Sequence, residues 1–470
     1  MAEFLESLAA VLEKHVPGCR GLVSAERLSG GASQETYRLV IRSDAGEKRL
    51  AMRRAPGGHA PEPTSGQPGL VTEALLMRTA RAAGVPEPEV VHVLEPADGL
   101  GEGFVMEWLE GEALGARIVR DPSLDAIRPR LAEQCGQILA RIHAIDLRAS
   151  GLEPRLARMT PEQFVRQTWQ RYQALGTPQP MIDFSARWLL ENLPASYQES
   201  LVHNDFRNGN IMVSPRGVVA VLDWEIAHIG DPMRDLGWIC TNSWRFGQTE
   251  LPVGGFGRYE DLFRGYEQVS GQKVDPARVK FWEVFGSFWW SVGCLGMAEH
   301  YRSGPDKTVE RPAIGRRTSE CQVDCVNLLI PGPVELLTPA ATKSTLDMPR
   351  IDELVTSVRD YLRSDVMNAT KGRLQFLARV AGNSLDVVLR ELELGAELRA
   401  RQTDRLRGLL SEGGDLESLR WTLVRGLRDH TIPLGLPGLA EYLREAVVNQ
   451  AAIDQPSYSG FKTALKGSRA

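Results

Sequence analysis

Apolar residues in the first 110 positions fall in short alternating runs, which are typical of β-strands. These runs cover residues 21–28, 36–43, 48–54, 89–94 and 103–109. Asp44-Ala45-Gly46-Glu47 separates the second run from the third and predicts a hairpin turn. Segments 2–15 and 71–83 instead have apolar residues at helical spacing. The pattern predicts a mostly antiparallel sheet with one helix inserted and another before it.

From about residue 112 to 330 the spacing becomes mainly helical. The helical segments lie near 123–147, 161–175, 181–194, 257–269, 276–301 and 315–329. Segment 201–223 interrupts them, because two β-like runs flank the turn Ser214-Pro215-Arg216-Gly217. The sequence therefore predicts a β-hairpin inside a helical region.

A third region follows a stretch with four prolines, residues 331–350, which has the composition of a linker. Amphipathic helices are predicted at 351–363, 371–399, 401–411, 415–428 and 436–450, with a frayed end over the last twenty residues. We predict an α+β chain divided at 1–107, 108–332, 333–348 (linker) and 349–470, the last part being all-α.

Composition narrows the classes of function. The 470 residues are 43% apolar and 24% charged, as in an ordinary soluble globular protein. The net charge of −5 argues against binding to nucleic acid, which needs a basic face. No apolar run is long enough to span a membrane. Six scattered cysteines, with Cys321 and Cys325 as buried thiols, favour a reducing, cytoplasmic environment over a disulfide framework.

The strongest chemical signal is the run from Leu201 to Asn210, followed by the predicted hairpin and Asp223. Asp205 and Asn210 have the Asp-x-x-x-x-Asn spacing of a kinase catalytic loop, with His203 two residues before the aspartate. Any one of these residues alone is more often a turn former or a helix cap. Their order and spacing together favour phosphoryl transfer.

Phosphoryl transfer to a hydroxyl needs a carboxylate that orients the hydroxyl and accepts its proton, which suits Asp205. It also needs oxygen ligands for Mg²⁺, which suits Asn210 and Asp223. The predicted hairpin explains the spacing between Asn210 and Asp223, because its two short strands bring the chain back to the place where the first strand starts.

The sequence here resembles the aminoglycoside phosphotransferase and choline kinase-like family of small-molecule kinases, over about residues 20–330. The resemblance rests on segments 203–210 (HNDFRNGN), 221–225 (VLDWE) and 230–238 (GDPMRDLGW). It implies a protein-kinase-like bilobal fold, with an antiparallel β-rich N-lobe and a mainly helical C-lobe, and the cofactors ATP and Mg²⁺.

The resemblance also assigns roles to single residues. Asp205 is implied to be the catalytic base, with Asn210 and Asp223 as Mg²⁺ ligands. Four residues are implied to support them: Asp235 fixes the loop backbone, His203 braces it, Arg207 lies within it, and Glu225 reaches the metal or its waters. Asn204 departs from the family pattern, where a small residue such as glycine is usual, and we expect this to alter loop packing more than chemistry.

In the N-terminal lobe the resemblance implies three nucleotide-binding parts. A loop over the phosphates contains Gly30, Gly31 and Ser33. Arg53 occupies the place of the kinase strand lysine, with Arg54 as the alternative if the register shifts by one residue, and Glu73 is its candidate partner or a surface acid.

The third part is the hinge at 106–111, where the backbone of Glu107 and Leu109 would hold adenine. Several residues are candidates for the acceptor site, although aromatic residues at helical spacing are more often core. They are Asn242, Trp244, Arg245, Trp282, Phe285, Phe288, Trp289 and Tyr301.

A resemblance to one branch of this family suggests the acceptor. Arg53, the loop Asp-Phe-Arg-x-Gly-Asn and the run 223–232 look like the branch of this family that is fused to acyl-CoA dehydrogenases, whose acceptors are 4-hydroxyacyl-CoA thioesters. Residues 347–450 resemble a small helical companion domain of such kinases. We therefore expect a small hydroxylated acceptor, most plausibly a hydroxyacyl-CoA, with an acyl-CoA dehydrogenase or a second copy as partner.

Two other functions stay open at this stage. One is phosphorylation of aminoglycoside antibiotics, which the acidic total permits. The other is a pseudokinase or nucleotide-binding scaffold, against which the intact Asp205, Asn210 and Asp223 argue. In the C-terminal region, the apolar face of 371–399 is predicted to be bundle core or a docking surface, and Arg373, Arg379 and Arg390 are either solvated or ligands for CoA phosphates.

Overall fold

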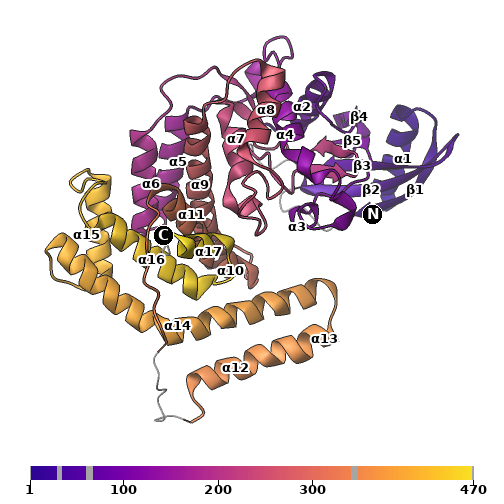
Figure 1. Ribbon diagram of the computed structural model, residues 1–470. Coiled ribbons are helices and arrows are strands. Elements are labelled where there is room, and N and C mark those ends of the chain that lie inside the picture. Colours follow the sequence, from indigo (N-terminus) through magenta and orange to yellow (C-terminus); the bar gives the residue numbers. More distant parts are fainter. Residues whose placement is uncertain (1, 29–33, 60–66, 340–347, 468–470) are drawn as a thin grey trace. The chain divides into compact units, whose positions relative to one another are not determined.

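A computed structural model describes residues 2–28, 34–59, 67–339 and 348–467. Its contacts divide the chain into two compact units (Figure 1). Unit 1 comprises residues 1–161 and 194–282, and unit 2 comprises 162–193 and 283–470. The boundaries predicted from the sequence, at 107, 332 and 348, stay a prediction.

Unit 1 begins with a five-stranded antiparallel sheet in the order β1-β2-β3-β5-β4. Its strands are β1 (Cys19–Arg27), β2 (Glu35–Ser43), β3 (Gly46–Arg54), β4 (Val90–Val93) and β5 (Gly103–Glu107). Ser43 pairs with Gly46 at the predicted hairpin turn. The predicted antiparallel sheet is confirmed, with strand ends shifted by no more than a few residues.

Two helices pack on this sheet. Helix α1 (Ala2–His15) packs against β1, and its Leu8 and Leu12 share a buried core with Leu50 and Met52 of β3. Helix α2 (Leu70–Ala82) packs against β4 and β5. Because side chains alternate along a strand, Arg53 projects from β3 on the face opposite to Leu50 and Met52.

The rest of unit 1 is mainly helical. It contains α3 (Gly115–Ile118), α4 (Arg128–His143), α7 (Met233–Cys240) and α8 (Tyr259–Ser270). Helices α4 and α8 pack so closely that a Cβ on Gly136 would lie 2.1 Å from the Leu262 carbonyl oxygen. Two small antiparallel pairs lie beside them: β6 (Ser200–Val202) with β9 (His228–Gly230), and β7 (Ile211–Ser214) with β8 (Gly217–Val221). The predicted hairpin is therefore confirmed.

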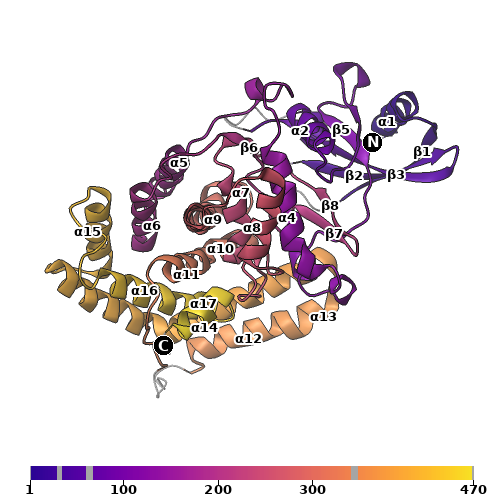
Figure 2. The same ribbon diagram turned by 45° about the horizontal axis from the view of Figure 1, so that its top comes forward.

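Unit 2 is entirely helical in the residues described. Helices α5 (Pro161–Ala174) and α9 (Pro276–Ser303) belong mostly to it. It also contains α6 (Pro180–Glu191), α10 (Glu310–Arg316), α11 (Thr318–Leu329), α12 (Ile351–Tyr361), α13 (Met367–Ala369), α14 (Gly372–Leu410), α15 (Leu416–Arg428), α16 (Leu439–Asp454) and α17 (Ser459–Lys466). The two helices predicted at 371–399 and 401–411 form a single helix, α14, because no proline or other helix-breaking residue separates them. Figure 2 shows α12 lying along α14.

One core joins segments of unit 2 that are far apart in the sequence. Phe184 of α6, Val323 of α11, Leu423 of α15 and Leu443 of α16 are among its buried residues. Residues predicted for the helical lobe and for the accessory region thus share one core. Asp183 of α6, fully buried, accepts a hydrogen bond at 2.8 Å from Nε of Arg428 on α15.

The prediction of a frayed C-terminus is wrong. Residues Ser459–Lys466 form α17, and Phe461 is only 6% exposed in the same core. The segment is short, and its apolar residues are stabilised by α16, which precedes it, and by α11, which lies distant in sequence. Among the residues described, no helix is long and apolar enough to cross a membrane.

Candidate active site

Asp205 lies in the loop between β6 and β7, with its carboxylate held on both oxygens. Oδ1 accepts hydrogen bonds from Trp238 Nε1 at 2.7 Å and from Arg207 Nε at 2.8 Å. Oδ2 accepts one from Asn210 Nδ2 at 2.5 Å. The Asp205 side chain remains 15% exposed. The carboxylate is therefore oriented by three donors and still reachable from solvent.

Asp235 fixes the backbone that leads into this loop. Its Oδ2 accepts from the His203 N–H at 2.8 Å, and its Oδ1 accepts from the Asn204 N–H at 2.7 Å. Burial alone would raise the pKa of Asp235, but hydrogen bonds from His143 and from the His203 N–H hold it below its ordinary value. The carboxylate is thus ionised at neutral pH, in the place that the resemblance implied.

His203 ties the loop to the segment before Asp223. Its Nδ1 accepts from the Asp205 N–H at 3.2 Å, so its Nε2, 3.1 Å from the carbonyl oxygen of Leu222, carries the proton. Burial lowers the pKa of His203, which keeps the ring neutral. The Leu222 N–H donates to the Asn210 carbonyl at 2.7 Å. These bonds place Asp223 next to Asn210.

Asn204 has a left-handed backbone, with φ of 70°. Glycine adopts this conformation at little cost, and asparagine is one of the side chains that tolerate it. The Asn204 amide donates to the Ile226 carbonyl at 3.2 Å, and its Oδ1 accepts from the Nε of buried Arg234 at 3.0 Å. Asn204 thus links the catalytic loop to two neighbouring segments.

We expect Asn204→Gly to lower the free energy of unfolding of unit 1 by about 1–2 kcal/mol, because two buried hydrogen bonds are lost while the backbone is relieved. The turnover number should stay within about threefold of the wild-type value, since no bond to Asp205 changes. Chemical denaturation and steady-state kinetics measure the two effects. A large fall in turnover with unchanged stability would contradict this structural role.

Arg53 is the centre of an ionic cluster between β3, α2 and the segment after β8. Its Nη2 lies 2.5 Å from Asp223 Oδ1 and 3.8 Å from Glu225 Oε2, and its Nη1 lies 3.6 Å from Glu73 Oε2. Gln34 accepts from Arg53 Nε and donates to Glu73 at 3.1 Å. Burial alone would lower the pKa of Arg53, but Glu73 and Asp223 raise it above its ordinary value.

The cluster fits a divalent cation. One guanidinium faces three carboxylates, and those of Asp223 and Glu225 are 31% and 29% exposed, whereas Glu73 is buried. Asn210 donates from its Nδ2 to both the carbonyl and the carboxylate of Asp205, so its Oδ1 is the atom that can bind a cation. Carboxylate and amide oxygens are the protein ligands of Mg²⁺.

Arg54 points away from this cluster. Its Nε donates to the Leu100 carbonyl at 2.6 Å, its Nη1 lies 3.6 Å from Glu35, and its guanidinium stacks 4.8 Å from the Phe4 ring. Arg53 is therefore the arginine of the cluster, and its contact with phosphate stays a prediction. The predicted phosphate loop, Gly30, Gly31 and Ser33, lies outside the described residues.

The predicted hinge follows β5. The Glu107 N–H donates to the Glu89 carbonyl at 2.8 Å, and the Glu107 carboxylate accepts from the Glu89 N–H at 3.3 Å. Leu109 lies two residues beyond the strand and is half-buried. Adenine binding by the backbone of Glu107 and Leu109 stays a prediction.

The six aromatic candidates differ in burial, and two of them are partly exposed: Trp289 is half-buried and Tyr301 is 38% exposed. Trp282, Phe285 and Phe288 are at most 1% exposed and belong to the interior. Trp244 instead lies beside the catalytic loop, with the Arg207 guanidinium 4.3 Å from its ring and the Trp238 ring 5.1 Å away. No role is predicted for Trp238 from the sequence, although it follows Asp235 by three residues and so lies on the same face of α7.

A family comparison accounts for this arrangement. A model described as the phosphotransferase enzyme family matches residues 24–271, just over half of the chain. The chain belongs to this family. Residues 368–458 match a separate domain of unknown function, DUF6285.

Curated relatives of this phosphotransferase are named as acyl-CoA dehydrogenase family members. Mouse acyl-CoA dehydrogenase family member 10 is 32% identical over 251 residues, which are 49% of this chain and 22% of that protein. Chicken family member 11 is 33% identical over 253 residues, 50% of this chain and 30% of that protein. The chain thus matches less than a third of the length of these relatives.

A solved structure supports the fold. The crystal structure of a protein assigned as an aminoglycoside phosphotransferase from Ralstonia eutropha matches with a TM-score of 0.55 and 23% identity, covering 67% of this chain and 95% of that one. The predicted kinase-like α+β fold is confirmed.

A buried carboxyl group next to the site of this phosphotransferase escaped sequence reasoning. Glu87, 2% exposed, lies before β4 and accepts a hydrogen bond at 3.1 Å from Nε1 of Trp224, the residue after Asp223. Its other oxygen, Oε2, is buried with no hydrogen-bond partner among the described residues. Burial raises the pKa of Glu87 well above its ordinary value. No local motif marks this contact, because 137 residues separate the two side chains.

This raised pKa gives Glu87→Gln a distinctive pH dependence. The unfolded chain releases the Glu87 proton above about pH 4.5, while the folded chain retains it, so folding of the wild type takes up a proton and stability falls as pH rises. The glutamine keeps the acceptor for Trp224 without a titrating group. We therefore expect the variant to be more stable than the wild type at pH 8, with the difference vanishing near pH 4. Urea unfolding across this range measures it, and a pH-independent difference would contradict a neutral Glu87.

Proposed function

We propose that this phosphotransferase is a kinase that moves the γ-phosphoryl group of ATP to a hydroxyl of a small acceptor, most plausibly a 4-hydroxyacyl-CoA. The observation that carries the proposal is the Asp205 carboxylate, oriented by Trp238, Arg207 and Asn210 and placed in one unit with the Arg53 cluster. A base, cation ligands and a phosphate-binding cation are the parts that this reaction needs.

Asp205 would receive the acceptor hydroxyl as a hydrogen-bond donor and take its proton as the acceptor oxygen bonds to the γ-phosphorus. The bond between that phosphorus and the β-bridging oxygen breaks in the same in-line displacement, so ADP leaves and no covalent enzyme intermediate forms. Asp235 and His203 would maintain the loop, because Asp235 accepts from the N–H groups of His203 and Asn204, and His203 accepts from that of Asp205.

Asn210 and Asp223 would hold Mg²⁺, with Glu225 near the metal or its waters. Bound Mg²⁺ neutralises charge on the phosphate oxygens during transfer. Arg53 now pairs with Asp223, and its fork of donors would turn to the α- and β-phosphates when nucleotide binds. Glu73 would keep the guanidinium in place from α2.

The acyl-CoA acceptor is supported by the names of the relatives, which are acyl-CoA dehydrogenase family members at 32–33% identity. An aminoglycoside acceptor is the second candidate, because the structural relative from Ralstonia is assigned to that activity. The net charge of −6 over residues 1–346 does not by itself select a cationic acceptor, since 37 basic residues accompany 43 acidic ones.

A coupled assay of ADP release separates these acceptors. Purified full-length protein with Mg²⁺ and ATP is offered 4-hydroxyacyl-CoA thioesters or kanamycin-type aminoglycosides, with Asp205→Asn as the blank. We expect acceptor-dependent ADP release with the thioester. Turnover only with aminoglycosides would assign the antibiotic activity, and tight Mg²⁺-ATP binding without any turnover would favour a pseudokinase.

A further inference from the structure

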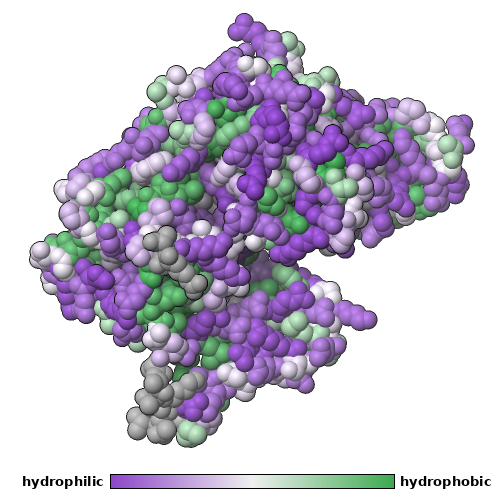
Figure 3. Space-filling view, in the orientation of Figure 1, coloured by the Kyte–Doolittle hydropathy of each residue, from purple (hydrophilic) through white to green (hydrophobic). Residues whose placement is uncertain are grey.

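A cleft of about 750 Å³ lies in unit 2, and its lining includes none of the candidate catalytic, metal-binding or nucleotide-binding residues. One wall is α10 with the segment before it, and the other is the N-terminal half of α14. The volume falls within the roughly 300–1,000 Å³ typical of small-molecule sites. Hydrophobic side chains show as green patches on the C-terminal helices in Figure 3.

A third of the exposed large apolar side chains among the described residues line this cleft. Fifteen large apolar residues are at least 38% exposed among those described, and five of them line this cleft. The five are Tyr301, Val309, Phe376, Val388 and Leu392. Soluble proteins seldom gather apolar surface in one concavity unless something covers it.

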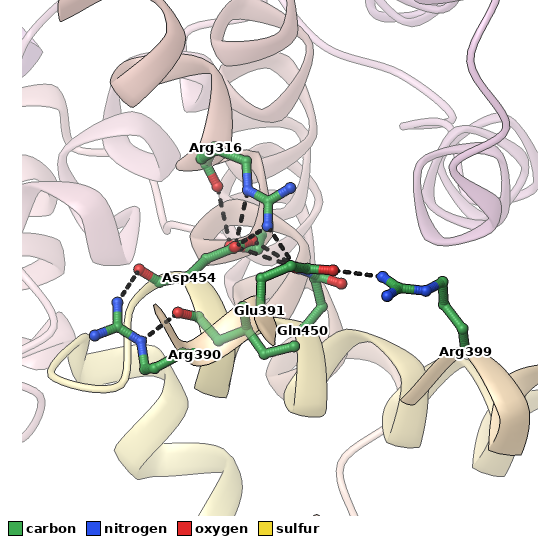
Figure 4. A network of polar contacts seen from close by, with 8 residues as sticks. Arg316, Arg390, Glu391, Arg399, Gln450 and Asp454 are labelled. Carbon is green, nitrogen blue, oxygen red and sulfur yellow. Dashed lines mark hydrogen bonds and ion pairs between the residues drawn. The ribbon is translucent and has the colours of Figure 1, made fainter. Parts of the chain in front are cut away.

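The charged groups around the cleft already have partners. Arg316 pairs with Glu391 at 3.0 Å and with Asp454 at 2.7 Å, and Arg399 binds the other side of Glu391 (Figure 4). Arg317 binds Glu320 through two bonds of 3.1 Å. The cleft therefore offers an apolar lining with neutralised charges at its edge.

Two further charges at the cleft are also satisfied. Glu310 pairs with Arg373, and Lys307 donates to the Tyr301 and Arg302 carbonyls at 2.6 and 2.9 Å. A ligand that buried charged groups of its own here would need counter-charges at the cleft, and these side chains already have partners. A hydrocarbon chain needs none, and it gains free energy from every methylene that leaves water.

We propose that this cleft binds a hydrocarbon chain, such as the acyl group of a thioester or of a free fatty acid. Val388 and Leu392 of α14 would contact it from one side and Val309 from the other. The site lies outside unit 1, so the proposal stands or falls independently of the kinase assignment.

Fluorescence titration of the full-length protein with cis-parinaric acid, a fluorescent fatty acid, tests the proposal. We expect saturable binding at one site, with displacement by dodecanoyl-CoA, by dodecanoate or by both. Displacement by the thioester alone identifies an acyl-CoA ligand, and equal displacement by both shows that the chain suffices. Shortening the competitor by two methylenes should weaken it by roughly an order of magnitude.

Two variants on α14 form a matched pair. Val388→Asp places a charge in the lining, whereas Leu374→Asp makes the same kind of change at a residue of the helix that is 64% exposed and outside the cleft. We expect Val388→Asp to bind the probe at least about tenfold more weakly than the wild type, and Leu374→Asp to bind it as tightly as the wild type. The melting temperatures of both variants should be unchanged. The proposal would be overturned if the probe showed no saturable binding, or if both variants lost probe binding equally. It would also be overturned if Val388→Asp changed the oligomeric state, measured as molar mass, without weakening probe binding.

Discussion

Asp205→Asn is expected to lower the turnover of phosphoryl transfer by about two to four orders of magnitude. The amide keeps the size of the carboxylate and can still accept hydrogen bonds from Trp238 and Arg207, but it cannot take the acceptor proton. Nucleotide affinity should remain within a few-fold, because the Arg53 cluster is untouched. Steady-state kinetics and nucleotide titration measure the two quantities.

Trp238→Phe is the matched control for this variant. It removes one of the two donors to Asp205 Oδ1 and leaves the carboxylate in place. We expect an intermediate loss of turnover, about tenfold, which corresponds to about 1.4 kcal/mol. If Asp205→Asn retains turnover near that of the wild type, Asp205 is not the base and the mechanism fails.

Asp223→Ala should weaken nucleotide binding in Mg²⁺ by at least about tenfold, or about 1.4 kcal/mol. The change removes a metal ligand and leaves Arg53 facing only Glu73 and Glu225. Binding of nucleotide in EDTA should change little or strengthen, since one negative charge near the phosphates is lost. Calorimetric titration with and without Mg²⁺ distinguishes the metal role from a general loss of the site.

Glu35→Gln supplies the control, because Glu35 is a carboxylate of β2 that pairs with Arg54 and not with the Arg53 cluster. We expect its nucleotide affinity to match that of the wild type. Equal Mg²⁺ dependence of ATP binding in Asp223→Ala and in the wild type would exclude Asp223 as a metal ligand.

The sequence predicts the catalytic loop well because its chemistry is local. His203, Asp205 and Asn210 lie within eight residues, and a hairpin of two short strands fixes the return to Asp223. Strand alternation likewise separates Arg53 from Arg54, and in the structure Arg53 lies beside Glu73 of α2 while Arg54 lies beside Phe4 of α1.

Contacts between distant segments escape such reasoning. Glu87 reaches Trp224 and Trp238 reaches Asp205 across large sequence separations, so neither pairing has a motif. The face of 371–399 was predicted as bundle core or docking surface. Leu374 and Val388 on this face are 64% and 42% exposed, because other faces of α14 pack against α12, α15 and α16.

Two of the three arginines considered as ligands for CoA phosphates, Arg373 and Arg390, have intramolecular partners. Arg390 donates to the carbonyl oxygens of Ile453 and Asp454 at the end of α16, and Arg373 pairs with Glu310. Sequence shows the charge of these side chains but not the carboxylates and helix ends that the fold brings to them. Neither is now assigned to the acceptor.

The most direct test of the central claim follows the phosphoryl group itself. Full-length protein is incubated with Mg²⁺, a 4-hydroxyacyl-CoA and ATP labelled with ¹⁸O in its γ-phosphoryl group, and the products are read by mass spectrometry. We expect a phosphorylated thioester that carries the label, formed only with Mg²⁺ and not by Asp205→Asn. Label recovered solely as inorganic phosphate, or solely on an aminoglycoside added in competition, would contradict it.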